Sequence, residues 1–327
     1  MTNPQALAFT WIAATVAIVV LNILLPQPFG LSAMGAVLEQ YLVLIALVAG
    51  IAAIRSFRPA ERLVVVALLV ALVAITLPRY VPAWISPVAL TGTEDVIRVA
   101  TWNMHAGPNA ADRALKGISS SDAQIMAMEE LGAEAVAALE GQASRFPYTA
   151  LTSDTAFLDV GLLSEYPILE TQRSTNPPFL RAVVDPPSAD PIVVYAVHIP
   201  LARLVYIGGI PVGVDFSVRD KAIATVRSRV QEDLARNQRV IVLGDFNMTE
   251  RERAYDLISS GLRDSHLDAG NGPGFSWRPP PIDFVPFGML RIDYVFSTPD
   301  LQPSTSSVDC SLPSDHCRVD VELAPTD

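Results

Sequence analysis

The segment GDFN, residues 244–247, places an acid and an amide two positions apart at the end of an apolar run. Alternate side chains of an extended chain share one face, so we expect Asp245 and Asn247 to point the same way and Phe246 the other. Thr249 and Glu252 match the capping box Ser/Thr-x-x-Glu, which predicts a helix that begins at once. Open α/β sheets bind ligands at this C-terminal end of their strands. Taken alone, however, the segment could equally be an ordinary turn and helix cap.

The same residue types interrupt five other apolar runs. An acid, an amide or an imidazole is normally excluded from a buried strand unless it is paired. One such residue could be a satisfied polar group of the core, but several of one chemical set indicate a shared cleft. They are Asn103, Glu129, Glu130, His198, Asp293, Asp315 and His316.

Short apolar runs broken by turn residues predict the strands that position these side chains. Two of the runs, 192–197 and 240–243, are apolar on both faces and must be covered on both sides. This favours an α/β or α+β sandwich over an open antiparallel sheet. The predicted strands are 97–102, 124–128, 160–163, 192–197, 239–243, 292–296 and 318–323, and the predicted helices are 133–140, 218–235 and 250–259.

The motifs TWNMH, MEEL, GLLSEYPI, VHIP, GDFN, RIDYVF and SDH follow one another along the chain. With these motifs, residues 96–323 resemble the endonuclease/exonuclease/phosphatase superfamily of divalent-metal phosphoesterases. Its members include abasic-site endonucleases, DNase I-like nucleases, sphingomyelinases and inositol-polyphosphate phosphatases. The resemblance implies an α/β fold, namely a four-layer DNase I-like sandwich of two packed mixed sheets flanked by helices, with the site at one end of the sheets.

The resemblance also implies a metal site. Glu130, the second acid of MEEL, matches the metal-binding glutamate of the family, with Asn103 and Asp315 beside it in the metal and phosphate shell. The family usually has Gln where this chain has Glu129, which leaves open which of the two acids binds the metal. Carboxylate, amide and water ligands suit Mg²⁺, with Mn²⁺ or Ca²⁺ as alternatives, and the sequence offers no Cys/His cluster for zinc.

The catalytic roles are carried over in the same way. Asp245 matches the residue that orients or deprotonates the attacking water, and Asn247 the amide that holds a phosphate oxygen. His198 and His316 match the two imidazoles on the phosphoryl group, and Asp293 the carboxylate that holds His316. A carboxylate in that position fixes the tautomer of a histidine and favours its cationic form.

Residues 1–90 are almost wholly apolar and predict a membrane anchor with three transmembrane helices at 6–25, 33–54 and 63–78. The catalytic domain is then 91–327, with the boundary near Leu90. A signal peptide is the competing interpretation of the first helix, but there is no basic leader and no A-x-A-like cleavage site.

Arg55, Arg58 and Arg62 lie between the second and third helices, which predicts a cytoplasmic loop and an outer catalytic domain. Arg79 is a single charge that opposes this orientation.

The charge of residues 91–327 bears on the substrate. They contain 19 of the 23 Lys and Arg residues and 32 of the 34 Asp and Glu residues, a net charge of −13. Proteins that bind long nucleic acid usually have the opposite sign, so duplex DNA is disfavoured. An anchored enzyme meets lipid headgroups at high effective concentration.

These observations predict a phosphoesterase of the cell membrane that hydrolyses a phosphoester or pyrophosphate of a lipid-linked or cell-envelope compound on the outer face. The alternatives are an extracytoplasmic Mg²⁺-dependent nuclease and a membrane-bound interaction module without catalysis.

Four further residues are given no catalytic or metal-binding role. Cys310 and Cys317 would pair in an oxidising compartment and would otherwise be two buried thiols. His105 follows Asn103 closely and could line the cleft, but a turn residue is the favoured interpretation; His266 is interpreted as a solvated residue of a polar loop.

Overall fold

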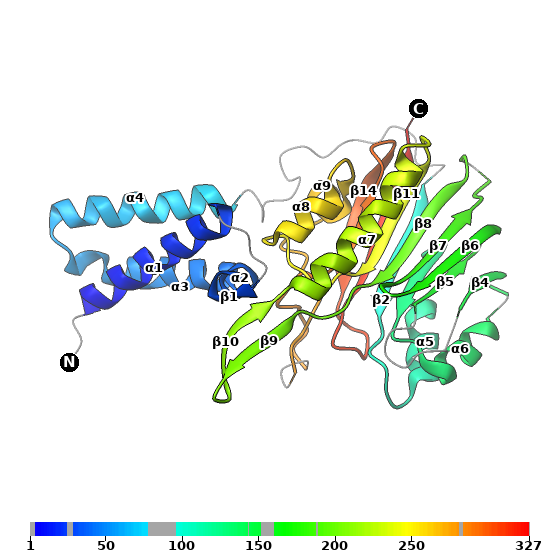
Figure 1. Ribbon diagram of the computed structural model, residues 1–327, viewed down its shortest axis with the longest axis horizontal. Coiled ribbons are helices and arrows are strands. Elements are labelled where there is room, and N and C mark those ends of the chain that lie inside the picture. The colour runs from blue at the N-terminus through cyan, green and yellow to red at the C-terminus, as the bar shows by residue number, and fades with distance from the viewer. Residues whose placement is uncertain are drawn as a thin grey trace.

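The computed structural model describes residues 4–24, 29–77, 96–142, 144–151, 160–187, 189–280 and 284–326. Within them the chain forms a group of apolar helices before residue 78 and a sandwich of sheets and helices after residue 95 (Figure 1). The predicted boundary near Leu90 and the opposing charge of Arg79 fall in 78–95, outside the described residues.

Two six-stranded sheets form the centre of the sandwich. In spatial order, the first contains β14 (Leu301–Asp309), β15 (Arg318–Pro325), β2 (Ile97–Asn103), β3 (Ile125–Glu129), β5 (Val160–Ser164) and β4 (Tyr148–Ala150). The second contains β12 (Arg263–Asp264), β13 (Asp293–Ser297), β11 (Arg239–Asp245), β8 (Ile192–His198), β7 (Pro178–Val184) and β6 (Ile168–Thr175). Both sheets are mixed, because β2 runs parallel to β3, and β8 parallel to β11, while the other pairs are antiparallel.

The two central strands of the second sheet, β8 and β11, are buried on both faces, as their sequences predict. Val194 and Leu243 face the core between the sheets, whereas Val193, Tyr195 and Val242 face the outer core. This alternation follows from the two-residue period of a strand. Every predicted strand is present, with ends that differ by one or two residues.

Helices cover the outer face of each sheet and complete four layers. On the first sheet they pack around Trp102, and on the second around Phe246, which points away from its neighbours Asp245 and Asn247. The two pairs of covering helices are α5 (Ala110–Ser119) with α6 (Gly132–Glu140), and α7 (Ser217–Leu234) with α8 (Arg253–Ser259). The predicted four-layer sandwich is therefore confirmed.

The helix predicted from residue 250 begins only at Arg253. The Glu252 carboxylate accepts hydrogen bonds from the backbone N–H and the hydroxyl of Thr249, at 2.7 and 3.1 Å. The backbone N–H of Glu252 donates to the carbonyl of Thr249, and its carboxylate also pairs with Arg219. These contacts close residues 249–252 into a turn, so the capping box marks a turn that precedes the helix.

Three N-terminal helices are long and apolar enough to cross a membrane: Gln5–Leu24, Glu39–Ser56 and Pro59–Thr76. They correspond to α1 (Pro4–Leu24), α3 (Glu39–Ala53) continued by the short turn η1 (Ile54–Ser56), and α4 (Pro59–Thr76).

Two of the predicted helix boundaries were wrong. The second helix breaks at Leu38, because residues Leu31–Val37 form a separate helix, α2, which shares a small core with Val214 and Phe216 of the sandwich. The third helix begins at Pro59, where the Glu61 side chain accepts a hydrogen bond from the backbone N–H of Arg58 at 2.9 Å.

A small third sheet joins the helices to the sandwich. β1 (Phe29–Gly30) pairs with β10 (Ile210–Asp215), which forms a hairpin with β9 (Arg203–Ile207). Side chains connect the same two regions: Arg251 lies 3.5 Å from the Glu39 carboxylate and donates to the carbonyl of Thr76. The Tyr41 hydroxyl donates to the carbonyl of Met289.

Candidate active site

Backbone register brings the polar ends of the central strands together. β11 pairs with both β8 and β13, which puts Asp245 opposite His198 on one side and Asp293 on the other. β2 pairs with β3, so Asn103 lies opposite Glu129. Because both sheets end at the same edge of the sandwich, their polar residues face one another there.

Asp245 lies at the centre of this group and is almost fully buried. Its Oδ2 accepts from the amide of Asn103 at 3.1 Å and from the amide of Asn247 at 3.2 Å, and its Oδ1 accepts from the Asn247 backbone N–H at 2.9 Å. The preceding residue, Gly244, lets β11 lie close to β8. Its φ is +143°, and a Cβ there would lie 2.0 Å from the carbonyl oxygen of Val197.

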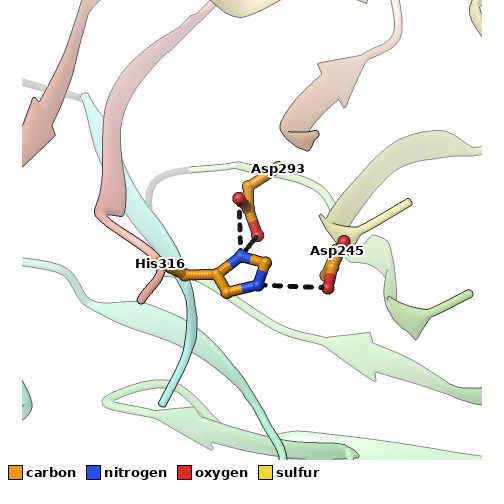
Figure 2. Close-up of side chains that lie close together, drawn as sticks. All are labelled: Asp245, Asp293 and His316. Carbon is orange, nitrogen blue, oxygen red and sulfur yellow. Dashed lines mark hydrogen bonds and ion pairs between the residues drawn. The ribbon is translucent and has the colours of Figure 1, made fainter. Parts of the chain in front are cut away.

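His316 and Asp293 form a buried pair beside Asp245. His316 Nδ1 lies 3.0 and 3.1 Å from the two carboxylate oxygens of Asp293, and its Nε2 points toward Asp245 Oδ2 at 3.8 Å (Figure 2). The Ser276 hydroxyl donates to Asp293 and accepts from its backbone N–H at 3.1 Å. Ser276 therefore orients the carboxylate, a role that no sequence motif indicated.

The two adjacent acids of MEEL point to different places. Glu130 has a left-handed φ of +57° and turns into the cleft, where it accepts from the Asn103 amide and from the Ala106 backbone N–H, both at 3.0 Å. Glu129 is fully buried and accepts from the Thr101 hydroxyl at 2.9 Å. Of the two, only Glu130 is accessible to a ligand in the cleft.

His198 faces the same two acids from the second sheet. Its Nε2 lies 3.7 Å from Glu130 Oε1 and 3.8 Å from Asp245 Oδ2. Its buried Nδ1 has no hydrogen-bond partner among the described residues. The following residue, Ile199, accepts from the Asn247 amide through its carbonyl at 2.8 Å, which ties the ends of β8 and β11 together.

Asp315 lies at the outer side of the group. His105 Nδ1 is 3.2 Å from its Oδ1, and the indole N–H of Trp277 donates to its Oδ2 at 3.4 Å. The Ser314 hydroxyl donates to the carbonyl of Asn103 at 2.7 Å, which fixes the loop of Asp315 against β2. His105 is thus an exposed residue at the rim of the site, which agrees with the alternative that it lines the cleft.

The loop that carries Asp315 and His316 is closed by a disulfide between Cys310 and Cys317. Arg278 lies inside this loop and donates to three of its backbone carbonyls, those of Cys310, Leu312 and Ser314. The position of both site residues therefore depends on a closed loop with a cation at its centre.

A cavity of about 500 Å³ opens beside Asp315 and is lined in part by His105, Arg113 and Phe284. Arg113 comes from α5, and its Nε and Nη2 are buried without a hydrogen-bond partner among the described residues. Burial lowers the pKa of the guanidinium, while the nearby carboxylates of Asp315 and Glu130 act in the opposite direction. This cation at the edge of the site was not predicted from the sequence.

Burial and neighbouring charges shift the pKa values of His316 and His198 in opposite directions. Burial alone would lower the pKa of His316, but the carboxylates of Asp293 and Asp245 raise it to about 10. Burial lowers the pKa of His198 to about 4, against the opposing effect of Glu130. At neutral pH the site thus holds one imidazolium and one neutral imidazole.

The carboxylates are affected by the same burial. It raises the pKa of Asp245 to about 7, although the His316 cation opposes the shift. It raises the pKa of Glu129 well above the usual value, with a further contribution from Asp293. Burial therefore favours the neutral form of Glu129, while Glu130 is the acid of the pair that faces the cleft.

The donor atoms fit a hard divalent cation. Glu130, Asp315 and Asn103 supply carboxylate and amide groups, and buried acids crowd the site with negative charge that a cation would offset. A second group, Asp245, Asp293 and His316, has its ligand atoms within 4.8 Å of one another. When His316 is protonated, however, both of its ring nitrogens are donors, so this group is better suited to hydrogen bonding.

Comparison with known families agrees with this geometry. The family model for the endonuclease/exonuclease/phosphatase family matches residues 100–316. The chain belongs to this family. Enzymes of the family are phosphoesterases or nucleases that use divalent metals, so the chain is assigned as a hydrolase of this kind. The search of curated proteins found no match.

Solved structures share the fold at low sequence identity. The 3′ phosphatase NExo from Neisseria, bound to a product DNA hairpin, is 16% identical, covers 70% of this chain and 99% of its own, and superposes with a TM-score of 0.58. A humanized D. rerio TDP2 is 18% identical with coverages of 70% and 99% and a TM-score of 0.57. A mannosyl-6-phosphatase from Bacteroides thetaiotaomicron is 16% identical with the same coverages and a TM-score of 0.53. These similarities establish the DNase I-like fold.

Proposed function

We propose that this protein is a divalent-metal-dependent phosphoesterase that hydrolyses a phosphoester or pyrophosphate bond of a lipid-linked or cell-envelope compound. In this proposal residues 1–90 anchor the chain in the cell membrane, and residues 91–327 form the catalytic domain on its outer face. Mg²⁺ is the expected metal, with Mn²⁺ or Ca²⁺ as alternatives.

The observation that carries the proposal is that the apolar helices join the sandwich at its catalytic edge. Arg251, which contacts Glu39 and Thr76, follows Asn247 by four residues. Met289, which accepts from Tyr41, precedes Asp293 by four residues. A substrate held in the bilayer would need to travel only a short distance to reach this edge.

Two observations support this orientation of the chain across the membrane. The basic loop between α3 and α4 lies at the end of the helices farthest from the sandwich (Figure 1). Arg55 and Arg62 belong to this end, and basic loops stay cytoplasmic. The Cys310–Cys317 disulfide is typical of an oxidising compartment.

The buried groups suggest how the reaction proceeds. Asp245, with a pKa near neutrality, is suited to take a proton from a water that attacks phosphorus. Asn247 donates to this carboxylate and orients it, and a phosphate oxygen would replace the carboxylate as acceptor when substrate binds. A metal ion held by Glu130, Asn103 and Asp315 would supply Lewis-acid polarisation of the phosphoryl group.

The histidines act on the phosphoryl group itself. The His316 imidazolium can donate from Nε2 to the charge that develops on phosphoryl oxygen, with Asp293 stabilising its cationic form. His198 is held neutral beside Glu130 and Asp245, where it can donate one further hydrogen bond to the same oxygens.

The test is hydrolysis of a soluble aryl phosphodiester by the purified full chain with Mg²⁺. We expect Asp245→Asn to lower kcat by about 10²- to 10⁴-fold. Asp256→Asn removes an exposed acid of the adjacent helix α8 and is the matched control, with kcat unchanged. Turnover that is equal in both variants would refute the assigned role of Asp245.

A nuclease is the second candidate. Two of the structural neighbours, NExo and D. rerio TDP2, have been solved with DNA product, which favours it. The charge of −13 on residues 91–327 opposes it. A panel of single-stranded DNA, duplex DNA and long-chain lipid pyrophosphates would choose between them, and absence of turnover on every substrate would favour the interaction module without catalysis.

A further inference from the structure

The β9–β10 hairpin carries an apolar surface that no described part of the chain covers. Between Arg203 and Asp215 the sequence LVYIGGIPVGV contains no charged residue. Six apolar side chains of the hairpin and its approach are between 39% and 72% exposed: Leu201, Leu204, Val205, Tyr206, Ile207 and Ile210. Adjacent residues of β9 are exposed together, so both faces of this strand are apolar and open.

A hairpin of this kind is unexpected in water. A two-stranded ribbon is marginally stable alone, and water-exposed edge strands usually carry charges that prevent association. Here β9 is the edge strand of its sheet and carries its only charge at Arg203, its first residue. The turn at Gly208 and Gly209, with φ of +57° and +80°, is regular, so the apolar tip is an ordered structure.

The hairpin is continuous with the apolar helices. Phe29 and Gly30, between α1 and α2, pair with Asp215 and Val214 of β10. The contact is close, because a Cβ at Gly213 would lie 2.7 Å from the Cα of Gly30. Figure 1 shows the hairpin projecting from the sandwich beside β1 and α2, at the end where the helices join.

We propose that the β9–β10 hairpin inserts its tip into the interfacial region of the same bilayer that holds the N-terminal helices. The proposal rests on the membrane attachment given under the proposed function. The outer edge of β9 presents unpaired backbone groups, which are not tolerated in the hydrocarbon core, so the insertion is shallow. Tyr206 and Arg203 fit this depth, since tyrosine lies at the headgroup level and arginine can reach lipid phosphates.

Insertion would bear directly on the catalytic site. β8 ends at His198, and only four residues separate it from the start of β9. The site and the hairpin therefore lie on one continuous segment. A hairpin fixed in the interface would hold the cleft against the membrane surface, where the phosphate of a lipid is found.

Site-directed fluorescence can test this with the full chain in lipid nanodiscs. The structure has no free cysteine among its described residues, so single cysteines can carry an environment-sensitive dye with the disulfide left intact. The test position is Ile207→Cys at the hairpin tip. Ile51→Cys on α3, which is 67% exposed, reports on the anchor. Tyr148→Cys on β4, which is 40% exposed and on the side of the sandwich away from the helices, is the water control (Figure 1).

We expect the dye at position 207 to be quenched by lipids labelled near the headgroup and protected from aqueous iodide by about fivefold or more relative to position 148. Iodide quenching at 207 equal to that at 148, with 51 quenched by lipid, would overturn the hairpin proposal alone. Protection at 207 from both quenchers would also overturn it, because the tip would then lie against protein, such as a second copy paired along β9. A dye at 51 that is open to iodide would instead refute the anchor.

Discussion

Neighbouring residues shift the pKa values of the buried histidines in this site. His316 and His198 are both buried and both face Asp245, yet only His316 has a carboxylate, that of Asp293, on its other ring nitrogen. The pKa of His316 rises and that of His198 falls for this reason. In the proposed mechanism, Asp293 therefore determines that His316 is the histidine that donates to the phosphoryl group.

Asp293→Asn tests this selection. Without the carboxylate, burial dominates and the pKa of His316 should fall from about 10. The active form carries the proton, so activity is lost as pH rises through that pKa, and the alkaline limb of the pH–kcat profile should move to lower pH. At pH 8 we expect kcat to fall by about 10²- to 10⁴-fold. An unchanged alkaline limb would show that Asp293 acts only on folding.

Arg113→Gln tests the cation beside Asp315. A substrate with a second anionic group, such as a pyrophosphate, can place that group against the guanidinium in the cavity. Loss of one charge-assisted hydrogen bond should raise KM for the pyrophosphate by about tenfold or more, with little effect on an aryl phosphodiester. Lys116→Gln, an exposed cation on the same helix, is the control. Equal effects on the two substrates would contradict this role.

The sequence predicted the site residues because each interrupts or ends an apolar run. All eight, namely Asn103, Glu130, His198, Asp245, Asn247, Asp293, Asp315 and His316, come together in one cleft, while their roles stay predictions. Ser276 and Arg113 could not be found in this way. Ser276 lies between Phe275 and Trp277 in a segment without a strand or helix, and Arg113 is an ordinary charged position of α5.

At the scale of elements, most of the buried strands were predicted and the edge strands were not. The buried strand β7 was missed as well, because it begins with a proline, Pro178, and has a charged residue, Arg181, at its centre. β6 and β14 are edges of their sheets and carry polar or alternating residues such as ETQRST and PSTSS. An edge strand is kept in place by its partner, so its own sequence lacks the apolar run that identifies a central strand. The β9–β10 hairpin is a different case, because its sequence LVYIGGIPVGV is apolar and was nevertheless not predicted to form strands.

The prediction that His266 is solvated was wrong, because the residue is buried although its sequence segment is polar. It lies in the short helix α9 (Ser265–Ala269) and fits between Gly270 and Gly274, where an added Cβ would collide with its ring. Its Nδ1 and Nε2 each lie 3.2 Å from an oxygen, those of the Ser306 hydroxyl and the Gly272 carbonyl. The burial of His266 therefore results from tertiary packing and could not be predicted from the polarity of the neighbouring sequence.

The pH dependence of stability should report on His266. Burial lowers its folded-state pKa to about 4, below the ordinary value of 6.5. Between these values the unfolded chain binds the proton and the folded chain does not, so stability falls as pH drops from about 6.5 to about 4, by on the order of 3 kcal/mol at most. His266→Asn should remove this part of the slope in thermal melts of the detergent-solubilised chain. A variant with the slope of the parent would show that other groups cause it.

For the whole molecule, the strongest consequence is that the catalytic edge and the apolar helices share one end. The net charge of the catalytic part is −13, which disfavours long polyanions in solution. With the proposed membrane attachment, a substrate confined to the same bilayer would avoid this cost, because it would not need to diffuse through the surrounding repulsive field. The composition therefore fits a substrate that arrives along the surface.

Reconstitution tests this at the scale of the molecule. A long-chain lipid pyrophosphate placed in the same vesicles as the full chain should be hydrolysed about tenfold or more faster than the same amount in separate vesicles. A soluble aryl phosphodiester should be hydrolysed equally in both preparations. Equal rates for the lipid would indicate a substrate that reaches the site from solution.

The closed loop between Cys310 and Cys317 has a practical consequence. It carries Asp315 and His316 around the Arg278 side chain, and closing so short a segment contributes on the order of 2 to 3 kcal/mol. Expression in a reducing host, or purification with dithiothreitol, would open the ring that holds together Asp315 and His316, the proposed metal ligand and the proposed proton donor. Preparations from the periplasm or from an oxidising strain are therefore the ones in which absence of activity would be informative.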